Sequence, residues 1–360
     1  MVTISLCMIV RDEELALERC LLTIHDMVDE INIIDTGSMD RTKEIARKYT
    51  DNIYDFGWID DFAAARNFAF QTATKDYILW LDADDTIEEG DRIRFKLLKQ
   101  VLTTAVDRVT MPYNLGFDHA GNVTSSLRRN RLVRRDCQFQ WIGPVHEYLN
   151  AWGPVLDSDV CITHKKEKTY TDRNLQIYQK RQKAGEEFSI RDLYYYANEL
   201  RDHRMDTEAV VYYDKMLKSG QGWIEDNIQA CLKMSECYQR LANKELQFHS
   251  LTRALLYERP RPDVSCALGA YFFEEKQYET AIYWYRQATE VTQPATMGMV
   301  NNATSTWFPN LQLCLCYDRL GQYEAAYTYN ETALRYNPTH PSLLYNRDYF
   351  KDVRKLGGTS

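Results

Sequence analysis

Short apolar segments of strand length alternate with longer segments of helical periodicity up to about residue 165. Such alternation predicts an α/β domain, in which a mostly parallel, Rossmann-like sheet carries helices on its faces. Strands are expected at 3–10, 30–35, 52–56, 77–82, 107–113 and 159–163, and helices at 12–27, 39–49, 61–74 and 86–103. Residues 128–141 indicate irregular or antiparallel strand additions to this sheet.

The pattern changes from about residue 172, where Tyr, Ala and Leu recur at helical spacing in paired segments. The clearest pair runs from Leu313 to Pro338, and a similar pair precedes it from Leu268 to Pro294. Their spacing resembles that of a tetratricopeptide repeat, in which helical hairpins stack on one another. Two weaker units fit around 197–213 and 238–260, and the longer segment Gln293 to Thr306 is expected to be a loop.

These two patterns divide the chain. An α/β domain is expected at 1–165, a helical linker at 166–190, tetratricopeptide-like repeats at 191–345 and a C-terminal tail at 346–360. The 360 residues are 44% hydrophobic and 27% charged, which is typical of globular protein with well-formed cores.

Charge and cysteine usage exclude some function classes. The formal net charge is -8, so the chain lacks the broad basic field of a general nucleic-acid binder. The nine cysteines show no zinc-like spacing and are expected to be reduced, mostly buried thiols. Residues 1–13 lack a basic leader and a cleavage site, and no apolar stretch is long enough to span a bilayer. We therefore expect a cytoplasmic protein without an integral membrane segment.

The apolar run Tyr77 to Leu81 stops abruptly in three carboxylates, Asp82, Asp84 and Asp85. A run covered on both faces is typical of a parallel strand, and ligands bind at the carboxyl edge of such sheets. Two acids spaced Asp-x-Asp can hold Mg²⁺ or Mn²⁺ there. Residues 86–89 look like a capping box, so Asp85 is expected to cap the next helix, a role that does not account for Asp82.

Two other strand endings are expected at the same edge as Asp82. The first strand ends in Val10-Arg11-Asp12-Glu13, and the second ends in Asp35-Thr36-Gly37-Ser38. A helix beginning near Ser38 or Met39 would present free backbone N–H groups, and Asp35 could accept a hydrogen bond from a base or a sugar hydroxyl. Together these endings predict a nucleotide pocket, while helix capping is the commoner role for Ser38 and Asp40.

Arginines are concentrated near this edge. Arg66 lies near the start of an expected helix, where it can bind a phosphate or a carboxylate bidentately or simply face solvent. Five more arginines follow between residues 128 and 135, which in an acidic chain indicates an anion such as the pyrophosphate of a nucleotide sugar. Some of them are expected to pair with surface acids instead.

Two histidines and one acid complete the candidate chemistry. His146 and Glu147 offer a general-base pair, and His164, which ends the last expected strand, offers a metal ligand. A single histidine is more often structural than catalytic, so these roles are hypotheses.

Residues 3–100 resemble the nucleotide-binding half of family 2 glycosyltransferases, which have the GT-A fold. The resemblance rests on three motifs in order: residues 8–13, residues 35–42 and the Leu81-Asp82-Ala83-Asp84-Asp85 strand end with its DXD motif. Residues 58–67, Arg131-x-x-Arg134 and residues 141–147, followed by helical repeats, resemble more narrowly the bacterial peptide S- and O-glycosyltransferases of glycocin biosynthesis.

The resemblance implies roles for individual residues. Asp35 would contact the base, Asp82 the ribose or the metal, and Asp84 the metal that bridges the donor diphosphate. Glu147 would be the base of an inverting transfer, although the family usually has Glu-Asp where this chain has His146-Glu147, so their roles could be exchanged. The full set implied for the donor is Val10, Arg11, Glu13, Asp35, Ser38, Arg66, Asp82, Ala83, Arg131 and Arg134.

The sequence therefore predicts a metal-dependent inverting glycosyltransferase, with Mn²⁺ or Mg²⁺, that moves a sugar from a UDP-linked donor to a Cys or Ser/Thr side chain of a peptide or protein. The repeats would bind the acceptor or mediate a homodimer. An alternative is transfer to a lipid-linked or cell-surface glycan. A second alternative is a non-enzymatic repeat scaffold with a degenerate transferase domain. The sugar cannot be named, because its specificity depends on a few loop contacts.

Overall fold

The computed structural model describes residues 1–118, 121–166, 171–291 and 296–357. The chain forms two compact units. The first comprises Met1–Leu115 and Ser126–Gly185, and the second comprises Gly116–Ser125 and Glu186–Ser360. The segment expected to be a linker contributes helix α5 (Arg173–Lys183) to the first unit.

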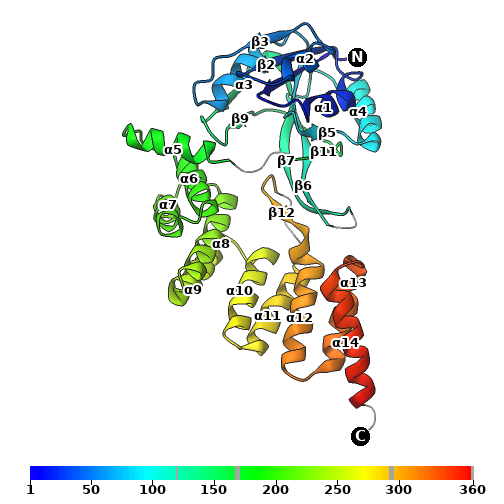
Figure 1. Ribbon diagram of the computed structural model, residues 1–360, viewed down its shortest axis with the longest axis vertical. Coiled ribbons are helices and arrows are strands. Elements are labelled where there is room, and N and C mark those ends of the chain that lie inside the picture. The colour runs from blue at the N-terminus through cyan, green and yellow to red at the C-terminus, as the bar shows by residue number, and fades with distance from the viewer. Residues whose placement is uncertain (119–120, 167–170, 292–295, 358–360) are drawn as a thin grey trace. The chain divides into compact units, whose positions relative to one another are not determined.

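The first unit is built on a mostly parallel sheet with the strand order β3-β2-β1-β4-β7-β6-β11-β5 (Figure 1). Strands β2, β1 and β4 run parallel, whereas β7 joins β4 antiparallel, as the additions at 128–141 predicted. The strands are β1 Ile4–Val10, β2 Glu30–Asp35, β3 Ile53–Asp55, β4 Tyr77–Trp80, β5 Asp85–Thr86, β6 Arg108–Phe117, β7 Val123–Arg134, β8 Gln140–Ile142, β9 Tyr148–Asn150, β10 Val155–Asp157 and β11 Ile162–His164. The predicted α/β fold is confirmed.

Both faces of the central strands are covered, which explains the continuous apolar run of β4. Tyr77 and Leu79 enter a core shared with α1 (Leu17–Ile24), α2 (Thr42–Ala46) and α4 (Glu89–Val101). Ile78 and Trp80 enter a second core with α3 (Phe62–Gln71) and the hairpin of β8 and β9. Because β1, β2 and β4 are parallel, their carboxyl ends meet at one edge of the sheet, where Arg11, Thr36 and Asp82 follow.

The second unit consists of helical hairpins. Its helices are α6 Ile190–Asp202, α7 Asp206–Lys218, α8 Ile224–Arg240, α9 Lys244–Arg253, α10 Pro262–Glu274, α11 Tyr278–Glu290, α12 Trp307–Arg319, α13 Tyr323–Tyr336 and α14 Pro341–Gly357. Short 3₁₀ turns lie at η2 (Ala254–Leu256) and η3 (Asn302–Ser305), and η1 (Arg135–Cys137) belongs to the first unit. The segment expected to be a loop contains β12 (Val300–Asn301) and η3, and its residues 293–295 lie outside the described residues.

Four hairpins share one turn. A left-handed residue follows the first helix of each: Arg204, Ala242, Lys276 and Gly321. The next residue then donates its backbone N–H to a carbonyl five positions earlier, as Gln322 does to Tyr317 at 2.9 Å. This is the Schellman arrangement, which ends one helix and turns the chain into the next. The repetition of one turn confirms the predicted tetratricopeptide-like repeats. Of the four left-handed residues, only Gly321 is a glycine, the residue type that predicts such a turn from sequence.

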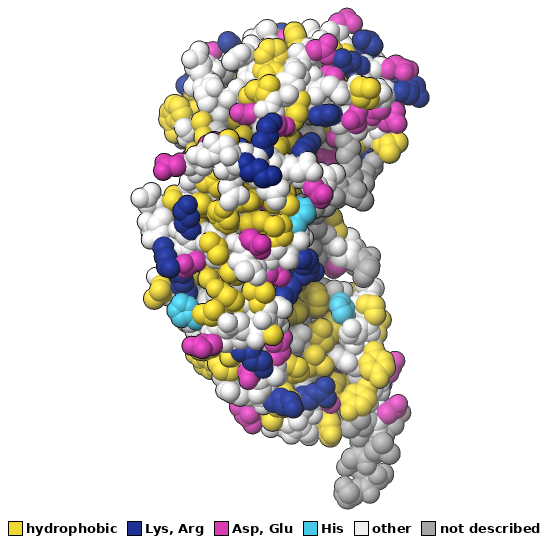
Figure 2. Space-filling view, turned by 60° about the vertical axis from the view of Figure 1, so that its left-hand side comes forward, with side chains coloured by type: hydrophobic (Ala, Val, Ile, Leu, Met, Phe, Trp, Pro, Cys, Tyr) yellow, Lys and Arg dark blue, Asp and Glu magenta, His cyan; other side chains and the backbone are white. Residues whose placement is uncertain are grey.

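Surface charges are mixed on the face drawn in Figure 2, where Lys and Arg side chains are interspersed with Asp and Glu. Among the described residues, no helix combines the length and the apolar content that crossing a membrane requires.

Gly269 on α10 sets the close approach of α10 and α11. A Cβ atom at this position would lie 2.8 Å from the ring of the buried Tyr285. We expect Gly269→Ala to cost about 1–3 kcal/mol of stability, because the ring cannot move without disturbing its neighbours. The measurement is the urea midpoint of the helical unit by far-ultraviolet circular dichroism. Gly90→Ala, in α4 of the first unit, is the control: nothing lies within 4 Å of its added Cβ, so it should leave the midpoint of the helical unit unchanged. An equal loss in both variants would contradict the packing argument.

Candidate active site

Asp82 follows β4 at the sheet edge and is held by two groups. Its Oδ1 accepts a hydrogen bond from Nη2 of Arg66 at 2.7 Å, and its backbone N–H donates to Oδ2 of Asp85 at 3.0 Å. Burial raises the pKa of Asp82, but the nearby charges of Arg66 and Arg131 outweigh burial and lower it to about 2. Asp82 is therefore a fixed carboxylate.

The prediction that Asp85 caps a helix is wrong. Helix α4 begins at Glu89, its N-cap Glu88 makes no side-chain cap hydrogen bond, and Thr86 pairs with Thr163 in the sheet. Asp85 is fully buried, and its oxygens receive the Tyr113 hydroxyl at 2.8 Å and face Nη1 of Arg131 at 3.0 Å. The carboxylate thus holds the turn after β4 together instead of capping a helix.

Arg131 does not reach the surface on which a donor would lie. Its side chain is fully buried, with the guanidinium carbon 3.9 Å from the ring centroid of Trp80 and 4.3 Å from that of Tyr113. Nη1 also donates to the backbone oxygen of Trp80 at 3.3 Å. The predicted contact with a donor diphosphate is therefore corrected, because no face of this guanidinium is open to a ligand.

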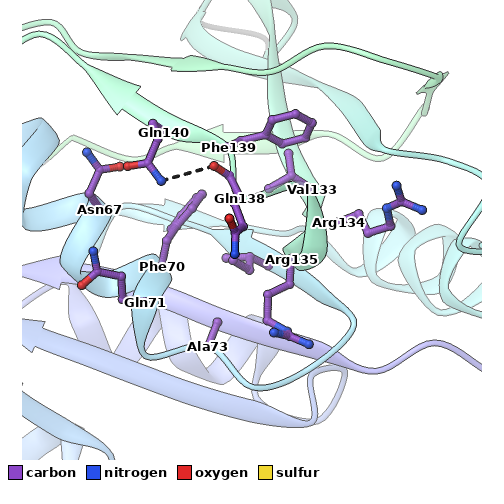
Figure 3. Close-up of a pocket in the computed structure, with 11 residues that line it drawn as sticks. Asn67, Phe70, Gln71, Ala73, Val133, Arg134, Arg135, Gln138, Phe139 and Gln140 are labelled. Atoms are coloured by element: carbon purple, nitrogen blue, oxygen red, sulfur yellow. Dashed lines mark hydrogen bonds between the residues drawn. The ribbon is translucent and has the colours of Figure 1, made fainter.

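Arg134 lies at the opposite end of β4 from Asp82. It stands across from Tyr77, pairs with Asp107 at 2.9 Å and donates to the backbone oxygen of Thr104 at 2.6 Å. It borders a separate pocket of about 400 Å³, which is also lined by Phe70 of α3 and by Phe139 and Gln140 (Figure 3). The structure therefore does not bring Arg134 to the predicted donor site.

Asp84, Asp85 and His164 form the cluster in the described residues that is suited to a metal ion, with candidate ligand atoms within 4.8 Å of one another. Antiparallel pairing of β5 and β11 places His164 opposite Asp85. Hydrogen bonds with Asp84 and Asp85 raise the pKa of His164 to about 10. Because Arg131 occupies Asp85, the partly exposed Asp84 and His164 are the better candidates. A carboxylate and an imidazole suit Mn²⁺.

The turn after β2 differs from its prediction. Asp35 is buried, and its carboxylate accepts the backbone N–H groups of Gly37 at 3.2 Å and Ser38 at 3.1 Å. The N–H of Met39 donates to Oδ1 of Asp12 at 2.7 Å. Helix α2 begins at Thr42, so the expected free N–H groups near Ser38 do not exist. The N–H groups of this turn are not free, because the carboxylates of Asp35 and Asp12 accept hydrogen bonds from them.

The ending of β1 is tied to the same turn. The backbone oxygen of Val10 accepts the N–H of Thr36 at 2.9 Å, and the N–H of Glu13 donates to Oγ1 of Thr42 at 2.7 Å. Arg11 is exposed, whereas Ala83 is buried in the core.

A hollow of about 160 Å³ beside these endings is strongly acidic. It is lined by Asp12, Glu13, Glu14, Leu15, Ala16, Asp40 and Asp84. Like charges repel, so a phosphate can approach this hollow only when cations accompany it.

Glu147 meets Asp82 through Arg66. Nε of Arg66 donates to Oε1 of Glu147 at 2.5 Å, while Nη2 holds Asp82. The guanidinium carbon lies 4.9 Å from the ring centroids of both Trp80 and Trp141. Burial lowers the pKa of Arg66, but the two carboxylates outweigh burial and raise it, so the residue stays charged. The alternative of a solvated Arg66 is excluded by its burial.

The loop that carries His146 and Glu147 is sharply turned. Gly143 and His146 both have left-handed φ angles, of 96° and 51°. The loop is fixed to α3 at two points: the N–H of Phe62 donates to the oxygen of Pro144 at 2.9 Å, and Asn67 exchanges hydrogen bonds with the backbone of Trp141. The structure thus brings together Arg66, Asp82 and Glu147.

Arg173 is a residue of this region that sequence reasoning missed. It opens α5, and its guanidinium carbon lies 4.6 Å from the ring centroid of Phe62. No local motif marks it, because the strand and turn patterns end well before this helix.

Comparisons with known proteins indicate a family for part of the first unit. Residues 5–135 match the family model described as glycosyl transferase family 2. A TPR repeat-containing protein of Synechococcus elongatus is 39% identical over 156 residues, which are 42% of this chain and 36% of the relative. The SPbeta prophage-derived glycosyltransferase SunS of Bacillus subtilis is 26% identical over 231 residues, 60% of this chain and 54% of the relative. The predicted family resemblance is confirmed for residues 5–135.

The chain spans only about a third to a half of the length of these two relatives. Among solved structures, the type IV pilus biogenesis factor PilW is 18% identical with a TM-score of 0.39, covering 48% of this chain and 74% of that one. The repeats are identified by the shared turn of the helical hairpins, and not by this structural similarity.

The buried pair of Arg131 and Asp85 allows a stability test. Arg131→Met leaves a buried carboxylate without its cation, which we expect to cost about 3–5 kcal/mol. The double variant Arg131→Met/Asp85→Asn should recover much of that loss. Urea unfolding followed by tryptophan fluorescence measures it, because Trp80 touches Arg131. The control Arg135→Met removes a partly exposed arginine and should cost less than about 1 kcal/mol. Equal costs for Arg131→Met and Arg135→Met would contradict the assignment.

Proposed function

We propose that this chain, whose residues 5–135 form a family 2 glycosyltransferase domain, is a metal-dependent inverting glycosyltransferase that moves a sugar from a UDP-linked donor to a peptide or protein side chain. The observation that carries the proposal is that candidate metal ligands and a candidate base lie at one edge of the sheet. Asp84 and His164 offer metal ligands, and Glu147 reaches the same edge through Arg66 and Asp82.

A divalent cation held by Asp84 and His164, with Asp82 beside them, would offset the charge of the donor diphosphate as the sugar leaves. The acidic hollow is the physical reason to expect one, since its carboxylates would otherwise repel the donor. Mn²⁺ and Mg²⁺ both remain candidates. Asp35 is proposed to lie near the nucleoside, at the turn from whose backbone N–H groups it accepts hydrogen bonds.

Glu147 acts as the base in this proposal. It accepts the proton of the acceptor thiol or hydroxyl while that group attacks the anomeric carbon. The bond from this carbon to the diphosphate oxygen breaks on the opposite face, and its electron pair leaves with the nucleoside diphosphate, so the configuration inverts. Arg66 holds the carboxylate in place and compensates its charge. His146 is next in the loop and could exchange roles with Glu147.

The acceptor assignment rests on the helical repeats and on the resemblance to peptide glycosyltransferases. Transfer to a lipid-linked or cell-surface glycan is the alternative. A scaffold without activity is less consistent with a chain that has Asp35, Asp82, Asp84 and Glu147 together, because an inactive descendant need not keep these acids. The cytoplasmic location and the homodimer remain predictions.

Donor turnover tests the proposal directly. Purified protein with Mn²⁺ should slowly hydrolyse UDP-glucose or UDP-N-acetylglucosamine and add a sugar-sized mass to peptides with a single Cys or Ser. Asp84→Ala and Glu147→Gln should each lower turnover by about 10²–10³-fold. Asp136→Asn, at an exposed carboxylate, is the control and should keep full activity. The enzyme proposal fails when no nucleotide binds and Asp84→Ala changes nothing, and transfer to lipid alone would favour the alternative.

A double-mutant cycle tests the link between Arg66 and Glu147. We expect Arg66→Met to lower turnover by about 10–100-fold, because the base loses its fixed position. The variant Arg66→Met/Glu147→Gln should be no slower than Glu147→Gln alone, since both changes remove the same function. Initial rates with the active UDP-sugar give the answer. Multiplying effects would show that Arg66 acts on the donor independently of Glu147.

A further inference from the structure

Three of the arginines expected to bind the donor diphosphate are paired with carboxylates of the protein. Arg131 is buried against Asp85, and Arg134 lies at the far end of β4. Arg66 is engaged by Asp82 and Glu147, with Trp80 and Trp141 beside its guanidinium. An acidic edge that is to bind a diphosphate therefore needs another source of positive charge.

Helix α5 supplies a candidate from outside the motifs. Arg173 is its first residue and is exposed, and it has no carboxylate partner among the described residues. Its guanidinium carbon stands 4.6 Å from the ring centroid of Phe62, which itself lies 4.8 Å from the ring of Trp58. Lys180, two turns further along α5, pairs with Asp60 at 2.5 Å. These contacts fix the start of α5 against the segment 58–62.

This segment adjoins the loop of the proposed base. The N–H of Phe62 donates to the oxygen of Pro144, three residues before Glu147. The charged groups that act on Arg173 also belong to this region. Surrounding protein lowers its pKa, as does the neighbouring Arg11, while Glu13 and Glu147 oppose that change. Arg173 is therefore held against Phe62, near enough to Arg11 and Glu13 after β1 and to Glu147 for their charges to act on it.

We propose that Arg173, together with Arg11, binds the β-phosphate of the nucleoside diphosphate donor. This deepens the proposed function and rests on it. As the sugar bond breaks, the electron pair goes to the β-phosphate oxygen, and the guanidinium of Arg173 donates hydrogen bonds to the charge that develops there. The planar guanidinium packs against the ring of Phe62, and the ammonium group of a lysine would pack less well there.

Nucleotide binding in the presence of Mn²⁺ tests the proposal. The probes are UDP and UMP, which differ by the β-phosphate, and calorimetry gives both dissociation constants. We expect Arg173→Ala to weaken UDP at least tenfold and UMP less than threefold, with Arg173→Lys in between. Lys183→Ala removes one positive charge about 15 Å further along the same helix and should change neither constant.

The outcomes separate the two proposals. Unchanged UDP affinity in Arg173→Ala, or equal weakening of UDP and UMP, overturns the role of Arg173 and leaves the glycosyltransferase proposal standing. Wild-type protein that binds neither nucleotide overturns the UDP-dependent function itself. Arg173 is exposed, so the variant should fold, and an unchanged melting temperature verifies this before binding is measured.

Discussion

The turn after β4 depends on a charge buried inside the first unit. Arg131 and Asp85 are both fully buried, and their pairing is completed by the Tyr113 hydroxyl and the backbone N–H of Asp82. Buried ion pairs add little net stability, because desolvation of two charges offsets their attraction. Their value here is geometric: fixing Asp85 also positions Asp82 and Asp84, which precede it, and pairing of β5 with β11 brings His164 to them.

Trp80 connects this buried pair to the base. The guanidiniums of Arg131 and Arg66 both lie against its ring, at 3.9 Å and 4.9 Å from the centroid. A large aromatic ring lets two cations stay close to each other, since each is attracted to the ring and to its own carboxylates. Movement of either arginine would therefore disturb the other. We infer that the proposed metal ligands and the proposed base form one mechanical unit centred on the end of β4.

The strand pattern, the meeting of three strand ends and the position of Asp82 at that edge were all predictable, because each depends on local periodicity and on the parallel sheet. The arginine segment was not interpreted correctly. Arg131 and Arg134 are three residues apart in a strand, so they point to opposite faces and stand about 10 Å apart along it. Periodicity could have separated them. The role of Asp85 could not be predicted, since it depends on Arg131 and Tyr113, which are distant in the sequence.

The family match ends at residue 135, but the proposed chemistry does not. Glu147 comes from the loop between β8 and β9, His164 from β11 and Arg173 from α5, all beyond that limit. The matched part supplies the sheet edge and its acids, which alone would repel a diphosphate. The later segments bring a base, a metal ligand and a cation to the same edge, and each is held there by contacts to the matched part. Binding of the donor and its activation are therefore expected to depend both on the matched edge and on segments that follow residue 135.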